Sequence, residues 1–582
     1  MTRRAGKGEL GKYLHASPHN PAAVDAPVDS GTAEVGARAD AATGSAHAEL
    51  KKELFMPETP AGIDVATPHE QTTGEARADG RQRRQRRRAS GFRQQVWRPL
   101  VNPYRPIEVL TEEQLAKVED ASFRILENIG LEFLHDGALD RLEKVGAKVD
   151  RATKRVRMDR AMVLEYVAKA PAKFMLHARN PERSVTIGGN HVVFASVSSA
   201  PNVSDLDRGR RPGTRVDFQN LLRIAQSLNV VHSISGYPVE PADLPPPVRH
   251  LDAQYDFITL TDKIWMPSGI GAGRVADALA LDCIARGISE DEAARRPGLH
   301  TVINTNSPLR VDQQMIDGLT FLAEHGQAVI VTPFTLSGAM APATLAGALA
   351  LQNAEALGVI AYMQMVKPGA LAIYGCFTSN VDMKSGAPAF GTPEYTRAAM
   401  AGGQLARRYK LPYRSSNCCS ANAVDAQAAY ESCMSLWGAV MGGANMVKHG
   451  AGWMEGGLVA SYEKMILDAE ILQTMSEALQ PFAVDEDALG LDAIKEVGPG
   501  GHFFGAAHTL QRYETAFYAP ILSDWRNFET WREAGGLDAA QRANAIWKQI
   551  LAEYEPPPID PGVDEALRDY VARRKEEGGV GS

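Results

Sequence analysis

Residues 328–362 read AVIVTPFTLSGAMAPATLAGALALQNAEALGVIAY. The first four residues are apolar and mostly β-branched, which favours a short buried strand. The stretch after Pro342 is long and apolar, as is typical of a buried helix. Because it contains Gln352, Asn353 and Glu355, we interpret it as a barrel helix rather than a membrane span. A strand followed by such a helix forms one βα unit.

The same unit recurs along the chain. Apolar, β-rich runs begin near Val192, Val231, Ile264, Thr301, Ala328, Leu371, Leu411 and Asn445. Helical stretches lie between them, including 217–228, 311–325, 342–362, 394–409 and 426–441. Eight such units over about 260 residues predict an α/β fold of the closed (β/α)₈ TIM-barrel type. A doubly wound open sheet is the alternative, but no GxGxxG follows the first strand to support it.

The remaining segments predict a tail, a lead-in domain and a C-terminal extension. Residues 1–95 have few aromatics and no periodicity, which predicts a disordered, Arg-rich tail. We interpret its arginine run at 81–88 as a solvated basic tail. The alternative is an RNA-binding or localisation segment, which the lack of aromatic residues between the arginines disfavours. Residues 105–190 predict a small α/β lead-in domain, 191–480 the barrel, and 481–582 a helical extension covering it.

The lead-in domain carries recognisable helix signals. Thr111 and Gln114 have the spacing of a capping box, with Thr111 as the N-cap. Apolar residues then recur at helical spacing as far as Phe133. A second helix is predicted from Asp159 to Ala168, after a polar segment that resembles a hairpin.

Composition excludes several classes of protein. The 582 residues carry a net charge of −8, which gives no general attraction to nucleic acid or to an anionic membrane. Five cysteines without a CxxC pair predict neither a disulfide framework nor a structural zinc site. No signal peptide is evident. We therefore expect a reduced, cytoplasmic protein.

Aromatic residues recur at the expected carboxyl ends of the strands, where barrel enzymes place their active sites. They are Tyr237, Trp265, Phe334, Tyr374, Phe377, Tyr413 and Trp453. Converging rings with one carboxylate suit a quaternary ammonium ion, held by cation–π attraction. In the alternative interpretation these rings only fill the core of the barrel. No HExxH occurs, and His502 and His508 fall on different helix faces, so no metal site is predicted.

Five segments in order carry a family resemblance. They are Thr378–Gly386, Gly391–Tyr395, Asn422–Ser432, Ala451–Gly457 and Gly498–Phe503. Here the chain resembles the trimethylamine:corrinoid methyltransferase family, whose wider membership includes glycine betaine methyltransferases. The resemblance runs from residue 105 to residue 535.

The resemblance implies a TIM barrel that moves a methyl group from a methylated amine to Co(I) of a corrinoid. The sequence lacks the DxHxxG cobalamin-ligand motif, so we expect no directly bound cofactor and a small corrinoid-binding partner protein. Archaeal trimethylamine members of the family place pyrrolysine at the barrel mouth. The equivalent region here, Asn417 to Ser420, contains only standard residues.

A site without pyrrolysine suits a betaine-like substrate, because a quaternary nitrogen leaves as a neutral amine without prior protonation. Arg414 or His449 is the candidate to hold a substrate carboxylate. Asn417, Glu455 and His449 are the candidate catalytic residues. Two alternatives remain open: transfer to another acceptor such as a folate, and a betaine-binding or sensing barrel without turnover. Homo-oligomers are common among large apolar barrels, so self-association is also left open.

Overall fold

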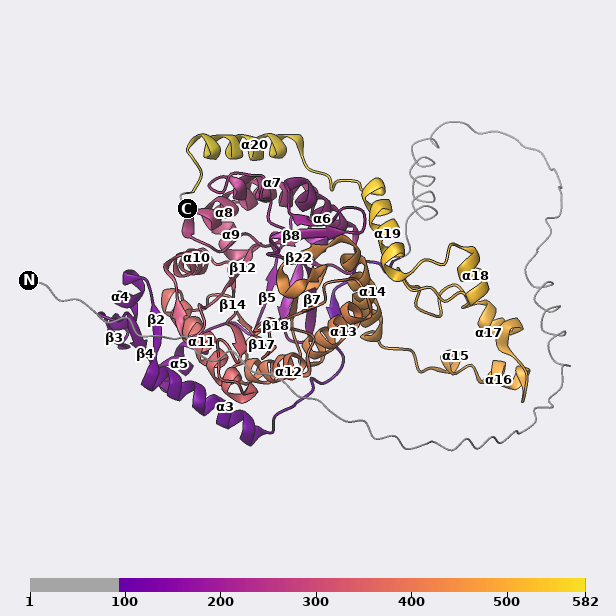
Figure 1. The fold of residues 1–582 in the computed structure, drawn as a ribbon, viewed down its shortest axis with the longest axis horizontal. Coiled ribbons are helices and arrows are strands. Elements are labelled where there is room, and N and C mark those ends of the chain that lie inside the picture. The colour runs from indigo at the N-terminus through magenta and orange to yellow at the C-terminus, as the bar shows by residue number, and fades with distance from the viewer. Residues whose placement is uncertain (1–93, 581–582) are drawn as a thin grey trace, which may run out of the picture. The chain divides into compact units, whose positions relative to one another are not determined.

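A computed structural model describes residues 94–580. The arginine run at 81–88, and nearly all of the tail predicted over residues 1–95, lie outside this range. The described residues form one compact unit, whose core is a barrel of parallel strands wrapped by helices (Figure 1).

Eight parallel strands form the barrel, in the spatial order β11-β10-β7-β20-β19-β16-β14-β12. Their bounds are β7 His191–Ser196, β10 Ser233–Ile234, β11 Ile264–Trp265, β12 His300–Ile303, β14 Ala328–Val331, β16 Ala372–Gly375, β19 Tyr413–Ser416 and β20 Met446–Ala451. A parallel bridge between Trp265 and Leu299 joins β11 to the start of β12 and closes the ring. The predicted (β/α)₈ barrel is therefore confirmed, and every strand begins within two residues of its predicted start.

One helix follows each strand and packs on the outside of the barrel. In chain order they are α6 Arg215–Ser227, α7 Arg249–Leu260, α8 Ala272–Arg286, α10 Gln313–Glu324, α11 Leu345–Val366, α12 Pro393–Arg408, α13 Ala426–Met441 and α14 Tyr462–Ala478. The predicted span 426–441 coincides with α13. The other predicted spans differ at their ends by up to four residues, where capping geometry rather than apolar periodicity sets the boundary.

An apolar plug closes the amino end of the barrel. The hairpin of β5 (Lys173–Leu176) and β6 (Val185–Gly188) precedes the first barrel strand. Its buried residue Ile187 clusters with residues from the barrel strands, among them Val193, Ile330 and Ile373. The open end of the barrel is therefore the one at the carboxyl ends of its strands.

The lead-in domain explains why α11 is apolar on every side. This domain comprises α3 Glu112–Arg124, β2 Leu131–Phe133, α4 Asp136–Lys144, β3 Lys148–Asp150, β4 Arg155–Arg157 and α5 Arg160–Val167. Helices α3 and α5 pack on α11 from outside the barrel, so α11 is buried from Ala348 to Gln364. Among the described residues, α11 is the one helix long and apolar enough to cross a membrane, and 83% of its apolar window is buried inside the protein. A helix that is hydrophobic all round is expected in such a position.

Two helix starts in the lead-in domain agree with their predictions. Thr111 and Gln114 form the expected capping box at the start of α3. Asp159 caps α5 by accepting a hydrogen bond from the amide of Met162. After α3, one π-helical turn leads into β2, so the helix ends before Phe133.

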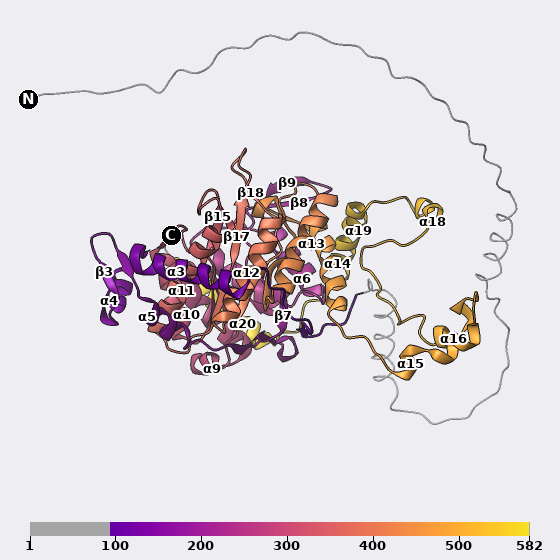
Figure 2. The ribbon, with the colours of Figure 1, turned by 90° about the horizontal axis from the view of Figure 1, so that it is seen from below.

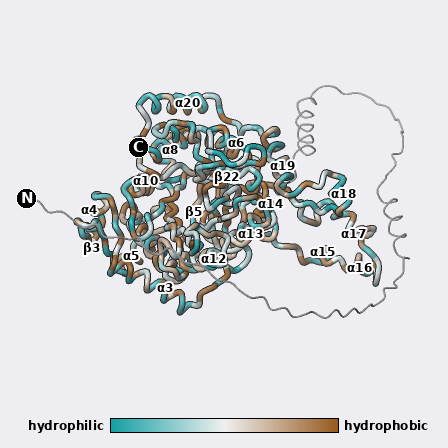
Figure 3. Tube along the Cα trace, viewed as in Figure 1, coloured by the Kyte–Doolittle hydropathy of each residue, from teal (hydrophilic) through white to brown (hydrophobic). Residues whose placement is uncertain are grey.

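The C-terminal extension has two parts that differ in how they pack against the barrel helices. Helices α19 (Ala539–Glu553) and α20 (Pro561–Glu576) pack on the outer barrel helices, α19 on α14 and α6, and α20 on α7 and α8. Helix α20 is largely hydrophilic (Figure 3). The short helices α15 (Glu486–Leu489), α16 (Leu491–Val497) and α17 (Ala507–Leu510) lie on a segment that leads away from the barrel helices (Figures 1 and 2).

Candidate active site

A cavity of about 1020 Å³ opens at the carboxyl ends of the barrel strands. Each of the eight strands, or the segment that follows it, contributes to its wall. Its volume lies at the upper end of the range for small-molecule sites. Two small sheets rise beside it, one of β15 (Phe334–Ser337), β17 (Phe377–Val381) and β18 (Pro388–Ala389). The second contains β8 (Asn202–Asp205), β9 (Gly209–Pro212), β21 (Trp453–Met454) and β22 (Val459–Ser461).

Six of the eleven predicted site residues line this cavity. They are Tyr237, Phe334, Phe377, Arg414, His449 and Trp453. The ring centroids of Phe334 and Phe377 are 5.0 Å apart. The rings of His449 and Trp453 stack at 5.2 Å, and Phe377 lies 6.3 Å from Trp453. Residues far apart in the chain thus form one aromatic wall.

The other five predicted residues do not line the cavity. Trp265 stacks on Phe257, and Glu455 forms an ion pair with Arg210. The hydroxyl of Tyr374 donates to Asn353, and the hydroxyl of Tyr413 donates to the carbonyl of Ala399. The side-chain amide of Asn417 donates to the carbonyl of Gly450. Successive side chains of a strand point to opposite faces. Tyr413 consequently lies on the outer face of β19 while Arg414 points inward.

A bulge in β20 brings two consecutive basic residues to the same face of the strand. Between its pairings with Phe194 and Ser196 of β7, β20 advances from Val447 to Ala451, which inserts two extra residues. His449 has a φ of 55°, an uncommon conformation for a residue with a side chain. The bulge allows both Lys448 and His449 to line the cavity. Lys448 was not among the predicted site residues, because the carboxyl end of this strand was expected to begin at His449.

Arg414 is a buried cation without a counter-ion. Its exposed fraction is 2%, and its Nε and Nη1 have no hydrogen-bond partner among residues 94–580. No described carboxylate lies within ion-pair distance, and the guanidinium carbon lies 5.1 Å above the ring of Phe377. Burial lowers the pKa of Arg414, yet arginine stays protonated in proteins. The cavity wall therefore carries, at Arg414, a positive charge that no described carboxylate balances.

The protein environment disfavours the charged forms of the two neighbouring basic groups. Burial, together with the charge of Arg414, holds the pKa of Lys448 and of His449 well below the usual values. The Lys448 amine donates to the carbonyl of Ser235 at 2.7 Å and lies 2.7 Å from Sδ of Met266. The imidazole Nδ1 of His449 has no partner among the described residues.

Trp453 is fixed in place by Phe390 and Gly457. Phe390 is buried beside it, with ring centroids 5.2 Å apart. A Cβ added at Gly457 would lie 2.7 Å from Cζ2 of Trp453, and the φ of Gly457 is 102°. Phe390 escaped prediction because it lies in a loop rather than at the end of a barrel strand.

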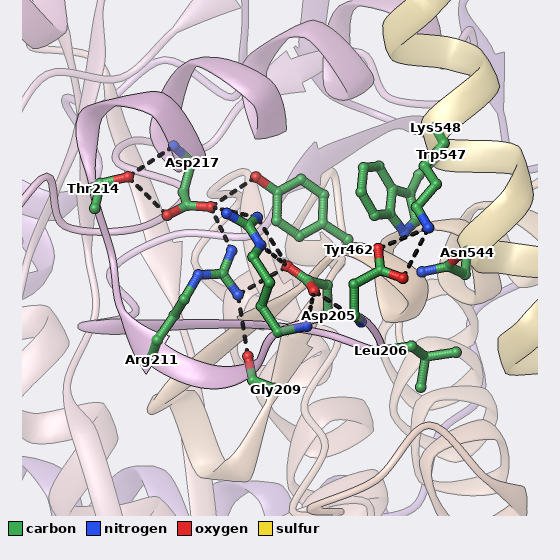
Figure 4. A network of polar contacts seen from close by, with 12 residues as sticks. Asp205, Leu206, Gly209, Arg211, Thr214, Asp217, Tyr462, Asn544, Trp547 and Lys548 are labelled. Atoms are coloured by element: carbon green, nitrogen blue, oxygen red, sulfur yellow. Dashed lines mark hydrogen bonds and ion pairs between the residues drawn. The ribbon is translucent and has the colours of Figure 1, made fainter.

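A polar network holds the small sheet that carries Trp453 (Figure 4). Strand β22 pairs with β8, which joins the segment after β20 to the segment after β7. Beneath them, the hydroxyl of Tyr462 donates to the buried Asp217 at 3.1 Å. Glu463 accepts hydrogen bonds from the indole of Trp547 on α19 and from the amide of Leu206. The rim at Trp453 is thereby anchored to the C-terminal extension.

Comparison with known proteins shows a match over nearly all of the described chain. The family model for trimethylamine methyltransferase (MTTB) matches residues 77–579. A glycine betaine methyltransferase of Desulfitobacterium hafniense strain Y51 is 40% identical over 472 residues, covering 81% of this chain and 98% of that protein. A trimethylamine methyltransferase, MttB, of D. hafniense strain DSM 10664 / DCB-2 is 29% identical over 473 residues, covering 81% and 94%. Among solved structures, the monomethylamine methyltransferase of Methanosarcina barkeri covers 80% of this chain and 88% of its own, with a TM-score of 0.44 and 10% identity.

Proposed function

The chain belongs to the trimethylamine methyltransferase (MTTB) family, and we propose that this methyltransferase takes its methyl group from a betaine, a quaternary ammonium compound that also carries a carboxylate. The methyl acceptor in this proposal is the Co(I) corrinoid of a separate, small partner protein. The similarity to a glycine betaine methyltransferase at 40% identity supports the substrate class.

The observation that carries the substrate class is the unpaired Arg414. A betaine brings a carboxylate, which can approach the unbalanced positive charge of Arg414 from the cavity that this side chain lines. Trimethylammonium brings only a positive charge, which Arg414 repels. Hydrogen bonds to charged groups contribute about 1.5–3 kcal/mol each. The charge of the wall therefore favours a zwitterion over a simple cation.

The aromatic wall suits the other end of a betaine. Phe334 and Trp453 line the same cavity as Arg414, and Tyr237 contributes from another strand. One face of the Phe377 ring already contacts the guanidinium of Arg414, so the ammonium group must use the remaining rings. A cation over such a ring gains about 0.5–2 kcal/mol.

Methyl transfer from this substrate needs no acid from the protein. The bond between the methyl carbon and nitrogen breaks, its electron pair stays on nitrogen, and a neutral tertiary amine leaves. The corrinoid supplies the nucleophile that receives the methyl group. The protein's part is to orient the substrate and to exclude water. At the region equivalent to the family's pyrrolysine, Asn417 donates to a backbone carbonyl and Cys418 to Tyr395, so neither activates an amine.

The proposal is tested with the purified chain and reduced cobalamin as methyl acceptor, followed by the visible spectrum of the corrinoid. Glycine betaine and two longer betaines are compared with trimethylamine. We expect methyl transfer from at least one betaine and none from trimethylamine. Transfer from trimethylamine alone, or from no betaine even with the corrinoid protein of the same organism, would reject the proposal.

A further inference from the structure

Residues 481–517, here called the arm, expose large apolar side chains along their whole length. These are Phe482, Val484, Leu489, Leu491, Ile494, Phe503, Phe504, Leu510, Tyr513 and Phe517. The exposed fractions of Phe482, Phe504 and Phe517 are 85%, 80% and 89%. Only Ala493 and Ala506 of the arm are buried. The arm therefore has the apolar composition of a protein core, although its side chains are not packed into one.

The arm is anchored at its ends and free between them. It follows α14, and the chain returns to α14 after it, where Glu470 accepts hydrogen bonds from the amides of Ile521 and Leu522 and from the hydroxyl of Ser523. Among the described residues, the hydrogen bonds and ion pairs of 481–517 join the arm only to itself. The arm thus leaves the barrel helices and returns without docking on them (Figures 1 and 2).

Helix α13, which packs beside α14, exposes a row of large, mostly apolar side chains. Beyond the first turn its exposed residues are Tyr430, Met434 and Trp437, which follow helical spacing. The one charged residue of the helix, Glu431, is buried and accepts hydrogen bonds from the amides of Ser420 and Ala421. An outer barrel helix facing water is expected to carry charged residues on that face. The row of Tyr430, Met434 and Trp437, here called the α13 stripe, is therefore typical of a surface that another protein surface covers.

We propose that the arm of one chain covers the α13 stripe of a second copy of this chain, and that two copies exchange their arms in this way. Aromatic side chains bury about 150–250 Å² each, so the exposed rings and aliphatic groups of the arm offer on the order of 1,000 Å². A stable interface buries about 800 Å² per partner. A monomer rarely exposes an apolar surface of that size. The two surfaces lie on the same chain, so a twofold pairing buries both at once.

This inference does not depend on the proposed methyl transfer, because neither surface contributes a residue to the cavity. It is tested by sedimentation velocity of the full chain at micromolar concentration. We expect twice the chain mass for the wild type. The double variant Phe504→Ser, Phe517→Ser and the single variant Trp437→Ser should each raise the dimer dissociation constant by about tenfold or more.

Met383→Ser is the matched control, since Met383 is also exposed but lies on the β17–β18 hairpin. It should leave the dissociation constant unchanged, and far-UV circular dichroism should show that all variants fold. A monomeric wild type would overturn the proposal. A dimer that is weakened by Trp437→Ser but unaffected by the arm variants would overturn arm exchange in favour of direct α13 pairing.

A cross-linking experiment separates exchange between chains from docking within one chain. Chains carrying Trp437→Cys are mixed with isotope-labelled chains carrying Phe504→Cys, and the mixture is treated with a short bismaleimide. Peptides that join positions 437 and 504 can form only between two different chains. Their detection by mass spectrometry is the expected result. Their absence from a mixture that is dimeric by sedimentation would refute the proposed contact.

Discussion

Arg414 lies on the inward face of β19, its guanidinium against the ring of Phe377 and no described carboxylate within reach. An unpaired buried charge destabilises a folded chain. Such a group is retained where function requires it, and the Arg414 side chain lines the cavity. Burial and the charge of Arg414 lower the pKa of the neighbouring Lys448 and His449, which disfavours their charged forms.

Arg414→Gln should therefore weaken betaine binding and stabilise the fold at the same time. We expect the KM for the betaine to rise by about tenfold to a hundredfold, as the loss of charged hydrogen bonds implies. The melting temperature should rise, because a buried unpaired cation is removed. Steady-state kinetics and thermal unfolding measure the two effects.

Arg210→Gln serves as the control for that variant, because Arg210 lies at the rim and pairs with Glu455 outside the cavity. It should change the KM by less than about threefold. A fall in melting temperature for Arg414→Gln with an unchanged KM would assign Arg414 a structural role instead.

At the scale of secondary-structure elements, irregular segments shape the site more than regular ones do. The bulge in β20 directs Lys448 and His449 to the same face of the strand. The hairpin that follows presents Trp453 to the cavity, and Gly457 packs directly against the indole. Because β22 pairs with β8, this hairpin cannot shift without disturbing the segment after β7.

Gly457→Ala should displace Trp453. The new Cβ would lie 2.7 Å from Cζ2 of the indole, at a φ of 102° that L-residues rarely adopt. We expect a loss of stability of about 1–3 kcal/mol and a higher KM for the methylated amine. Urea unfolding and steady-state kinetics provide the measurements.

The adjacent Gly456 offers a matched comparison for this variant. Its φ is 63°, and an added Cβ would come no closer than 3.6 Å to the ring of Phe390. Gly456→Ala should thus cost only the backbone strain, about 1 kcal/mol, and leave the KM unchanged. Equal effects of the two substitutions on the KM would show that the packing of Trp453 is unimportant for binding.

At the scale of the whole molecule, three of the buried histidines in the described part of the chain have a lowered pKa. Burial lowers the pKa of His232 and of His300 to about 3. The pKa of His449 also lies well below its usual value, with burial as the largest cause. All three are therefore neutral in the folded protein at neutral pH. In the unfolded chain each would take up a proton below about pH 6.5.

Stability should accordingly fall as the pH falls from about 6.5 towards 3. The unfolded chain binds more protons in this window, so each histidine contributes a loss of up to about 1.4 kcal/mol per pH unit. Replacing His300 with Phe removes one buried titrating group, and the free energy of unfolding should then depend less steeply on pH. His502→Gln is the control, because His502 is exposed. Urea unfolding at a series of pH values measures the slope, and identical slopes for His300→Phe and the wild type would contradict the prediction.

The order and type of the elements could be read from the sequence because they depend on local patterns. Alternating strand and helix signals predicted the barrel, and capping residues such as Thr111 marked a helix start. The apolar stretch after Pro342 predicted a buried helix, and the lead-in domain supplies the cover that buries α11 from outside. These features depend on the spacing of neighbouring residues, which tertiary contacts strengthen but do not change.

Which side chains face the cavity was decided only by the tertiary structure. Successive side chains of a strand point to opposite faces, so Arg414 points into the barrel while its neighbour Tyr413 points outward. The bulge that brings Lys448 beside His449 depends on the pairing of β20 with β7, strands separated by more than 240 residues. The sequence alone thus determined the barrel and the aromatic, cationic character of its mouth, whereas long-range pairing selected the residues that form the wall.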